Sequence, residues 1–264
     1  KAALPAPAVL AIHGTAARGK ESLLDPTVMR GHRLFPIELA RRGYVVLAVD
    51  QYGFGGYLRE EQCESPDAAI QASIKRFYEC YPEWSLDGRR LLDLTRALDL
   101  LDILEYVQHS SGYGTIGNSL GGRGVIFLTA LDERIGAAAC STGISTHANN
   151  VHRLLLGGPL LSRKALAEMG RTGQLPWEYH EMIALCAPRA LMLIEPFNDD
   201  PSCNPDVYPN LQCFYQASKV YRFLGRPEHL SLYLHGDGHD LVDAVRDLAY
   251  DWLDRFLRPS GNIA

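Results

Sequence analysis

The sequence has no apolar run long enough to cross a bilayer as a helix. It also has no segment in which lysine and arginine cluster, and its net charge is −5 at pH 7. Nucleic acids and anionic membrane surfaces are recognised through concentrated positive charge, so we expect neither as a partner. Internal repeats, low-complexity tracts and linkers are absent as well. These absences favour a soluble globular protein that acts on a small molecule.

The six cysteines follow no recognised spacing. None of them forms a C-x-x-C motif, so neither a zinc ribbon nor a thioredoxin-like site is indicated. Cys140 and Cys186 lie in apolar stretches, which predicts buried thiols.

The other four cysteines bear on the compartment. Cys63 with Cys80, or Cys203 with Cys213, could form disulfides if the protein is exported. The chain begins at Lys1 in place of Met, as it would if a leader or an upstream segment had been removed. The sequence leaves the compartment undecided.

The composition is that of a protein with a sizeable core, since 47% of its 264 residues are apolar and 22% are charged. Short β-rich runs alternate with longer helical stretches, which predicts an α/β fold with a mostly parallel central sheet and helices on both faces. Strands are expected at residues 8–12, 44–49, 113–117, 135–140, 189–195 and 230–235. Helices are expected at residues 34–43, 66–80, 87–108, 119–131, 211–224 and 241–257.

A Gly-x-Ser-x-Gly motif centred on Ser119 lies in "GTIGNSLGGRG", residues 114–124. The match is weak alone, but a β-rich run precedes the serine and a helical run follows it. That context predicts a sharp strand-to-helix turn that projects a nucleophilic hydroxyl above the sheet. Gly117 and Gly121 flank the turn where a side chain would collide, and Gly122 allows the helix to approach closely. The alternative is a glycine-rich turn with an idle serine.

A serine nucleophile needs a base within hydrogen-bond reach. In hydrolases of this architecture the chain order is serine, acid, histidine, with the histidine after the last strand. His235 belongs to the end of that strand, whereas His239 lies on the following glycine-containing loop and is the preferred base. A metal site formed by His235, Asp237 and His239 is disfavoured, because a stretch broken by glycines fixes no ligand spacing. We therefore expect no metal and no cofactor.

The acid is expected after the penultimate strand, in "IEPFNDDPSCNP". Glu195 is placed at the strand end, and Asp199 lies far enough into the loop to turn back toward the histidine. Asp200 is the neighbouring alternative to Asp199.

Ester cleavage also needs hydrogen-bond donors directed at the developing oxyanion. The backbone N–H of Leu120, directly after the nucleophile, is one candidate. The second is expected from the loop after the first strand, where "IHGTAARG" places Thr15 behind His13 and Gly14. We interpret His13 as a brace for this loop.

Several stretches of the chain resemble the α/β-hydrolases of the dienelactone-hydrolase and acetyl-xylan-esterase-like group. They are "AVLAIHG", "ELARRGYVVLAVDQYGFG", "LLDLTRALDLLDILEYV", "IGNSLGGRGVIFLTALDERI", "APRALMLIEPFNDD" and "GHDLVDAVRDLAYDWLDRFL". The resemblance implies the α/β-hydrolase fold, with Ser119 as nucleophile, Asp199 as acid and His239 as base. It also implies an oxyanion hole formed by the Leu120 and Thr15 amides. Dienelactone hydrolases usually carry a cysteine nucleophile, so the serine favours ordinary ester substrates.

The resulting hypothesis is a serine carboxylic ester hydrolase that forms an acyl-enzyme on a small-molecule ester. We interpret 1–264 as a single domain in which residues 142–187, without strand periodicity, form an excursion over the active site. Such a cover would favour short-chain or acetyl esters. The alternatives are a peptidase of the prolyl-oligopeptidase-like type, which shares the triad order, and a non-catalytic binding module of hydrolase fold. The oligomeric state is left open.

Overall fold

The computed structural model describes residues 4–25, 27, 34–58, 64–147, 163–173, 176–201 and 203–258. In this part of the chain a seven-stranded sheet has the strand order β2-β1-β4-β5-β6-β7, with β3 paired to β1 beside this path. Every strand pair is parallel. The strands are β1 (Ala6–Ile12), β2 (Val45–Ala48), β3 (Val107–Gln108), β4 (Tyr113–Asn118), β5 (Ile135–Ser141), β6 (Ala190–Pro196) and β7 (Leu230–His235). This parallel sheet confirms the predicted α/β class.

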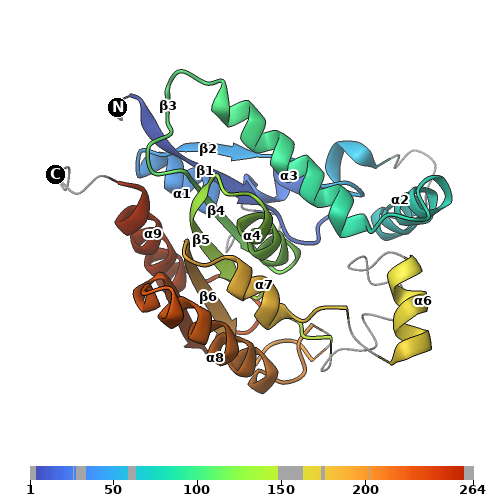
Figure 1. The fold of residues 1–264 in the computed structure, drawn as a ribbon. Coiled ribbons are helices and arrows are strands. Elements are labelled where there is room, and N and C mark those ends of the chain that lie inside the picture. The colour runs from blue at the N-terminus through green and yellow to red at the C-terminus, as the bar shows by residue number, and fades with distance from the viewer. Residues whose placement is uncertain are drawn as a thin grey trace.

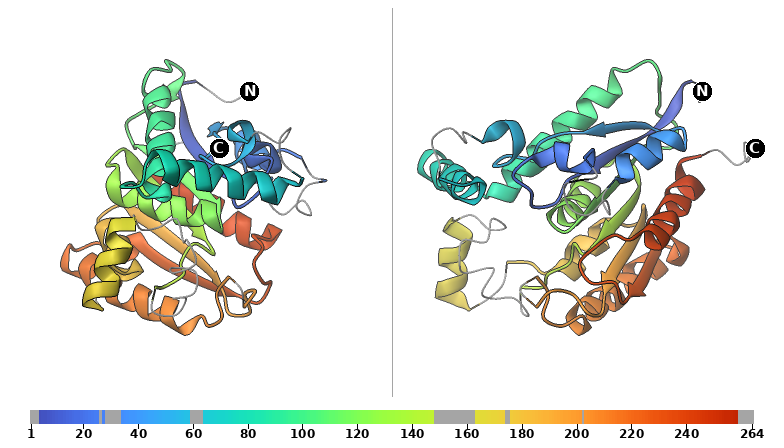
Figure 2. Two further views of the ribbon diagram at one scale, coloured as in Figure 1. Left: turned by 90° about the vertical axis from the view of Figure 1, so that its right-hand side faces the viewer. Right: turned by 180° about the vertical axis from the view of Figure 1, so that it is seen from behind.

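The helices cover both faces of the sheet (Figures 1 and 2). They are α1 (Phe35–Arg41), α2 (Pro66–Cys80), α3 (Leu86–Asp102), α4 (Leu120–Leu131), α6 (Arg163–Thr172), α7 (Tyr179–Leu185), α8 (Tyr208–Phe223) and α9 (Asp243–Leu257). Two large apolar cores result, beside two smaller apolar clusters. One contains side chains of α3, α4, α7 and α8, and the other contains side chains of α1 and α9. In the part of the chain with described structure, no helix combines the length and the apolar character that a membrane span requires.

Alternation along β1 explains how one strand serves both cores. Leu10 and Ile12 pack into the core with α3 and α4, while Val9 and Ala11 pack into the core with α1 and α9. Successive side chains of a strand point to opposite faces, so a strand buried on both sides is apolar throughout. This is why the continuous apolar run in the sequence predicted the strand correctly.

One predicted boundary is wrong. The helix expected over 87–108 ends at Asp102, and residues 107–108 form the short strand β3 instead. Val107 pairs with Ala6 at the beginning of β1. The apolar periodicity continues to Leu104, but pairing with a distant strand overrides it.

The expected excursion at 142–187 lies partly outside the described residues, at 148–162 and 174–175.

The cysteines agree only in part with expectation. Cys140 and Cys186 are buried thiols, as predicted. Cys203 and Cys213 are both thiols, so the disulfide considered between them is not formed in the structure. Cys80 is a free, exposed thiol, and its considered partner Cys63 lies outside the described residues.

Candidate active site

Ser119 occupies a sharp turn between β4 and α4. Its backbone has φ +60° and ψ −120°, a conformation that non-glycine residues rarely adopt. The Ser119 N–H donates at 2.9 Å both to the Ser141 carbonyl and to the Thr142 hydroxyl, at the end of the neighbouring strand β5. These two bonds hold the strained turn in place, and the serine itself stays partly exposed.

The glycines around Ser119 are required by the close approach of backbone segments. A Cβ on Gly117 would lie 2.6 Å from the Gly121 carbonyl carbon, and a Cβ on Gly121 would lie 2.2 Å from the Ile12 carbonyl oxygen. Real Cβ atoms do not approach backbone atoms this closely. The turn therefore has the geometry of a nucleophile elbow, with strand, glycine-lined turn and helix in the predicted order.

Asp199 and His239 form a hydrogen-bonded pair on the loops that follow β6 and β7. The Asp199 Oδ1 atom lies 2.6 Å from the His239 Nδ1 atom, and only 3% of the Asp199 side chain is exposed. Burial alone would lower the pKa of His239, but hydrogen bonds that the ring donates to Asp199 and Cys203 outweigh it and raise the pKa to about 9. Asp200, the alternative acid, is exposed, and its N–H donates to Asp199 Oδ1 at 2.7 Å.

Two asparagines that no sequence motif specifies hold the loop that carries His239. Asn118, next to Ser119, donates from Nδ2 to the His239 carbonyl at 3.2 Å and accepts from Ser141 and Thr142 hydroxyls. Asn198, next to Asp199, donates to the Gly236 carbonyl at 2.7 Å and accepts from the Gly238 N–H at 3.1 Å. These bonds bring Ser119, Asp199 and His239 to one end of the sheet. Nothing in their local sequence marks the two asparagines, since each role depends on a residue distant in the chain.

His235 does not join the pair. It is buried at the end of β7, and its Nδ1 atom accepts the Asp237 N–H at 3.3 Å. Burial lowers the pKa of His235, which favours the neutral ring. In the described part of the chain, no group of three or more His, Cys, Asp or Glu side chains is arranged to hold a metal ion.

The loop after β1 is braced by His13. The fully buried ring contacts the Gly14 carbonyl through Nδ1 at 2.7 Å and accepts the Gln51 N–H at Nε2, at 3.1 Å. Burial lowers the pKa of His13 to about 4, so the ring is neutral and Nδ1 is the donor to Gly14. Thr15 follows in an exposed position, and the Leu120 N–H lies at the first position of α4.

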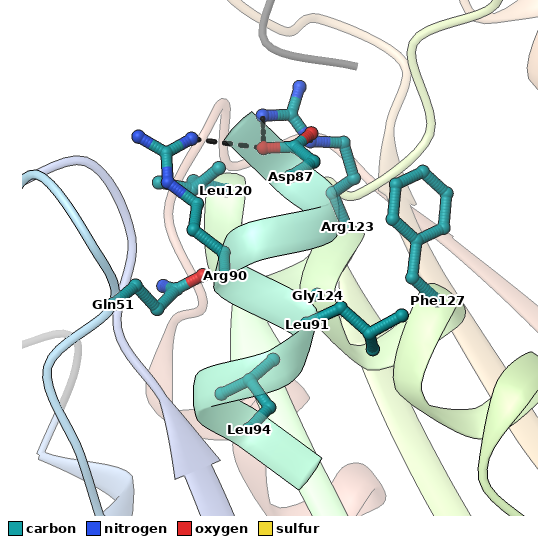
Figure 3. A pocket seen from close by; sticks show the side chains of 9 residues that line it. All are labelled: Gln51, Asp87, Arg90, Leu91, Leu94, Leu120, Arg123, Gly124 and Phe127. Carbon is teal, nitrogen blue, oxygen red and sulfur yellow. Dashed lines mark hydrogen bonds and ion pairs between the residues drawn. The ribbon is translucent and has the colours of Figure 1, made fainter. Parts of the chain in front are cut away.

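A buried cluster of charged side chains joins α3 to α4 (Figure 3). Its α4 member, Arg123, lies one helical turn after Ser119. Asp87 lies 3.0 Å from Arg90 and 3.0 Å from Arg123, and each of the three side chains is at most 12% exposed. They line a cavity of about 10 Å³, which is room for about one water molecule. A cavity of this size cannot hold a substrate, so we assign the cluster to the scaffold.

Comparisons with known proteins agree with the architecture. No family model matches the chain. The "Putative hydrolase YtaP" of Bacillus subtilis is 34% identical over 139 residues, which are 50% of this chain and 41% of that protein. A family 15 glucuronoyl esterase from Teredinibacter turnerae has a TM-score of 0.71 at 17% identity and covers 97% of this chain and 67% of its own.

Two further solved structures are similar. A "putative acetyl xylan esterase" from Bacteroides fragilis has a TM-score of 0.66 at 16% identity, over 98% of this chain and 69% of its own. Methylesterase BT1017 has a TM-score of 0.63 at 20% identity, over 95% of this chain and 48% of its own. The matched residues therefore cover less than half the length of YtaP and of that methylesterase. At these identities the shared feature is the fold, and the chain has the α/β-hydrolase fold that its sequence resemblance predicts.

Proposed function

We propose that the chain is a serine carboxylic ester hydrolase that works through an acyl-enzyme. The observation that carries the proposal is the Asp199–His239 pair, held beside the Ser119 elbow by the bond from Asn118 to the His239 carbonyl. Because Asp199 accepts a hydrogen bond from the Nδ1–H group, the proton of the neutral ring stays on Nδ1, and the lone pair on Nε2 is available as a base. A nucleophile, a base and a group that orients the base are the parts that acyl transfer requires.

In the proposed reaction, His239 takes the Ser119 proton as the hydroxyl oxygen attacks the ester carbonyl carbon. The oxyanion accepts hydrogen bonds from the Leu120 and Thr15 amides. The carbon–oxygen bond to the alcohol then breaks, and His239 returns its proton to the leaving alcohol. Water attacks the acyl-enzyme with His239 again as base, which releases the acid and restores Ser119.

The proposed substrates are short-chain or acetyl esters of small molecules, with carbohydrate esters as the first class to test. The support is the chemistry named for the structural neighbours, which are a glucuronoyl esterase, an acetyl xylan esterase and a methylesterase.

We also propose that 1–264 is one domain with 142–187 passing over the site. Helix α6, from this segment, lies with α2 at the end of the molecule toward which the strands run (Figures 1 and 2).

Labelling with a fluorophosphonate tests the nucleophile. We expect the folded protein to be modified at Ser119, with no modification after Ser119→Ala and full modification in the control Ser218→Ala, which changes a partly exposed serine on α8. An unmodified Ser119 in folded protein would overturn the proposal. A panel of p-nitrophenyl esters of increasing acyl length, run beside acetylated sugars and uronate methyl esters, then defines the substrate class.

Substitution of each of the two neighbouring aspartates tests which of them is the triad acid. Asp199→Asn should lower kcat by about 10³ to 10⁴-fold, because an amide in place of the carboxylate favours the wrong imidazole tautomer. Asp200→Asn should leave kcat within about twofold, since the Asp200 side chain is exposed and it is Asp199 that bonds the His239 Nδ1 atom. Equal losses in both variants would contradict the assignment of Asp199.

A further inference from the structure

Glu195 is a buried carboxyl group at the end of β6, four residues before Asp199. Its side chain is 0% exposed. The Asn210 Nδ2 atom on α8 donates to Glu195 Oε2 at 2.9 Å, and the Ile144 N–H, on the loop after β5, also donates to the carboxyl group. The side chain therefore joins three segments that surround the candidate site.

The hydrogen-bond pattern fits a neutral acid. Among the described residues, Glu195 Oε1 has no donor and Asn210 Oδ1, on the same amide that bonds Oε2, has none either. A carboxylate can only accept hydrogen bonds, whereas a protonated carboxyl group carries an O–H that can donate to such an oxygen. Burial is the main reason that the pKa of Glu195 rises to about 8, so the neutral form prevails at pH 7.

The titratable groups that face Glu195 come from four elements. Asp199 and His239 lie on the loops after β6 and β7, while Cys140 is on β5 and Cys213 on α8. The negative charge of Asp199 raises the pKa of Glu195, and the positive charge of protonated His239 lowers it. Such coupling is reciprocal, so a negative charge on Glu195 must in turn favour the protonated imidazole.

We infer that Glu195 is a positioning residue of the candidate site: as a neutral acid it fixes the strand end that carries Asp199, and when ionised it holds His239 protonated. An imidazolium cannot accept the Ser119 proton, so ionised Glu195 opposes catalysis. This inference rests on the proposed function for its effect on rate, but not for its effect on the His239 titration.

Glu195→Gln tests the inference, because it keeps the shape and removes the titrating proton. With the wild type we expect kcat/KM to rise with pH through the pKa of His239, and in Glu195→Gln this rise should move about one pH unit lower. The control Glu228→Gln makes the same chemical change on an exposed side chain beside the beginning of β7, and its profile should match the wild type. A folded Glu195→Gln protein with an unmoved profile would overturn the inference.

Two NMR titrations separate this inference from the proposed function. In a Ser119→Ala background, which has no turnover, the His239 imidazole should titrate at lower pH after Glu195→Gln. The second titration uses the wild type and therefore does not depend on the folding of a Glu195 variant. In it, the Glu195 carboxyl carbon should titrate near pH 8. A carboxyl group already ionised at pH 7 would refute the inference even if ester hydrolysis is found. Absence of hydrolysis with both titrations as expected would refute the proposed function alone.

Discussion

Gly122→Ala tests whether α4 must lie against β5 as closely as the structure shows. A Cβ on Gly122 would lie 2.3 Å from the Ser141 carbonyl oxygen and 3.0 Å from the Gly143 Cα atom. Both are backbone atoms, so no side-chain rotation can relieve the collision. The helix would have to move away from β5, and Ser119, at its beginning, would move with it.

The expected loss of stability is the difference between two opposed effects. Alanine in place of glycine favours a helix by about 1 kcal/mol. Overpacking of a fitted interior costs about 1–3 kcal/mol, and a collision with backbone belongs at the upper end. We therefore expect the free energy of unfolding to fall by about 2 kcal/mol, which for a protein of this size lowers Tm by roughly 4–8 °C.

Gly124→Ala is the matched control in the same helix. A Cβ on Gly124 would meet only side-chain methyl groups, of Leu94 at 3.3 Å and of Ile12 at 3.4 Å. Because these groups can shift slightly, the stability should change by less than about 1 kcal/mol. Urea unfolding measures stability, and fluorophosphonate labelling well below Tm should be slower in Gly122→Ala alone. If both variants are equally stable and equally labelled, the close approach of α4 to β5 is refuted.

Three other substitutions probe separate parts of the structure. Asn198→Ala removes two of the bonds between the loops that carry Asp199 and His239, so kcat/KM should fall about 10 to 100-fold. Unchanged kinetics would contradict this role of Asn198. Asp87→Asn leaves two buried guanidinium groups without a counterion and should cost about 3–5 kcal/mol in urea unfolding, whereas a cost below about 1 kcal/mol would refute this reasoning. Burial alone would raise the pKa of Glu38, but hydrogen bonds from Arg246 and Tyr250 outweigh it and lower the pKa. The stabilisation by Glu38 is thus present above its ordinary pKa and lost as pH falls through the lowered value, so the destabilisation of Glu38→Gln at pH 7 should shrink below about pH 4.

The fold was largely predictable because its strands and helices carry strong local signals. The apolar runs of β1, β5 and β6 are buried on both faces, and Gly43, with φ +90°, follows α1 as the sequence suggests. The end of α3 was not predictable. Leu104 continues the apolar spacing of the helix, and only the pairing of Val107 with Ala6, about a hundred residues away, makes the chain leave it.

The candidate site was predictable where chain order and turn chemistry specify it. Ser119 and His239 follow strand ends, and the structure brings Asp199 rather than Asp200 to the histidine. The distinction between the two aspartates depends on the direction of one loop, which Asn198 fixes through bonds to the Gly236 carbonyl and the Gly238 N–H. A contact of this kind leaves no local pattern, because any loop asparagine has the same sequence appearance.

The strained backbone at Ser119 has a counterpart that the Gly-x-Ser-x-Gly motif does not include. Thr142, at the end of the neighbouring strand, has φ +49°, and its hydroxyl accepts the Ser119 N–H while donating to Asn118. The Thr142 N–H in turn donates to the Ile194 carbonyl on β6 at 2.9 Å. Each conformation costs of order 1–3 kcal/mol and persists only where the surroundings determine it. The backbone conformation of Ser119 is therefore fixed by three adjacent strand ends acting together, and the motif supplies only one of them.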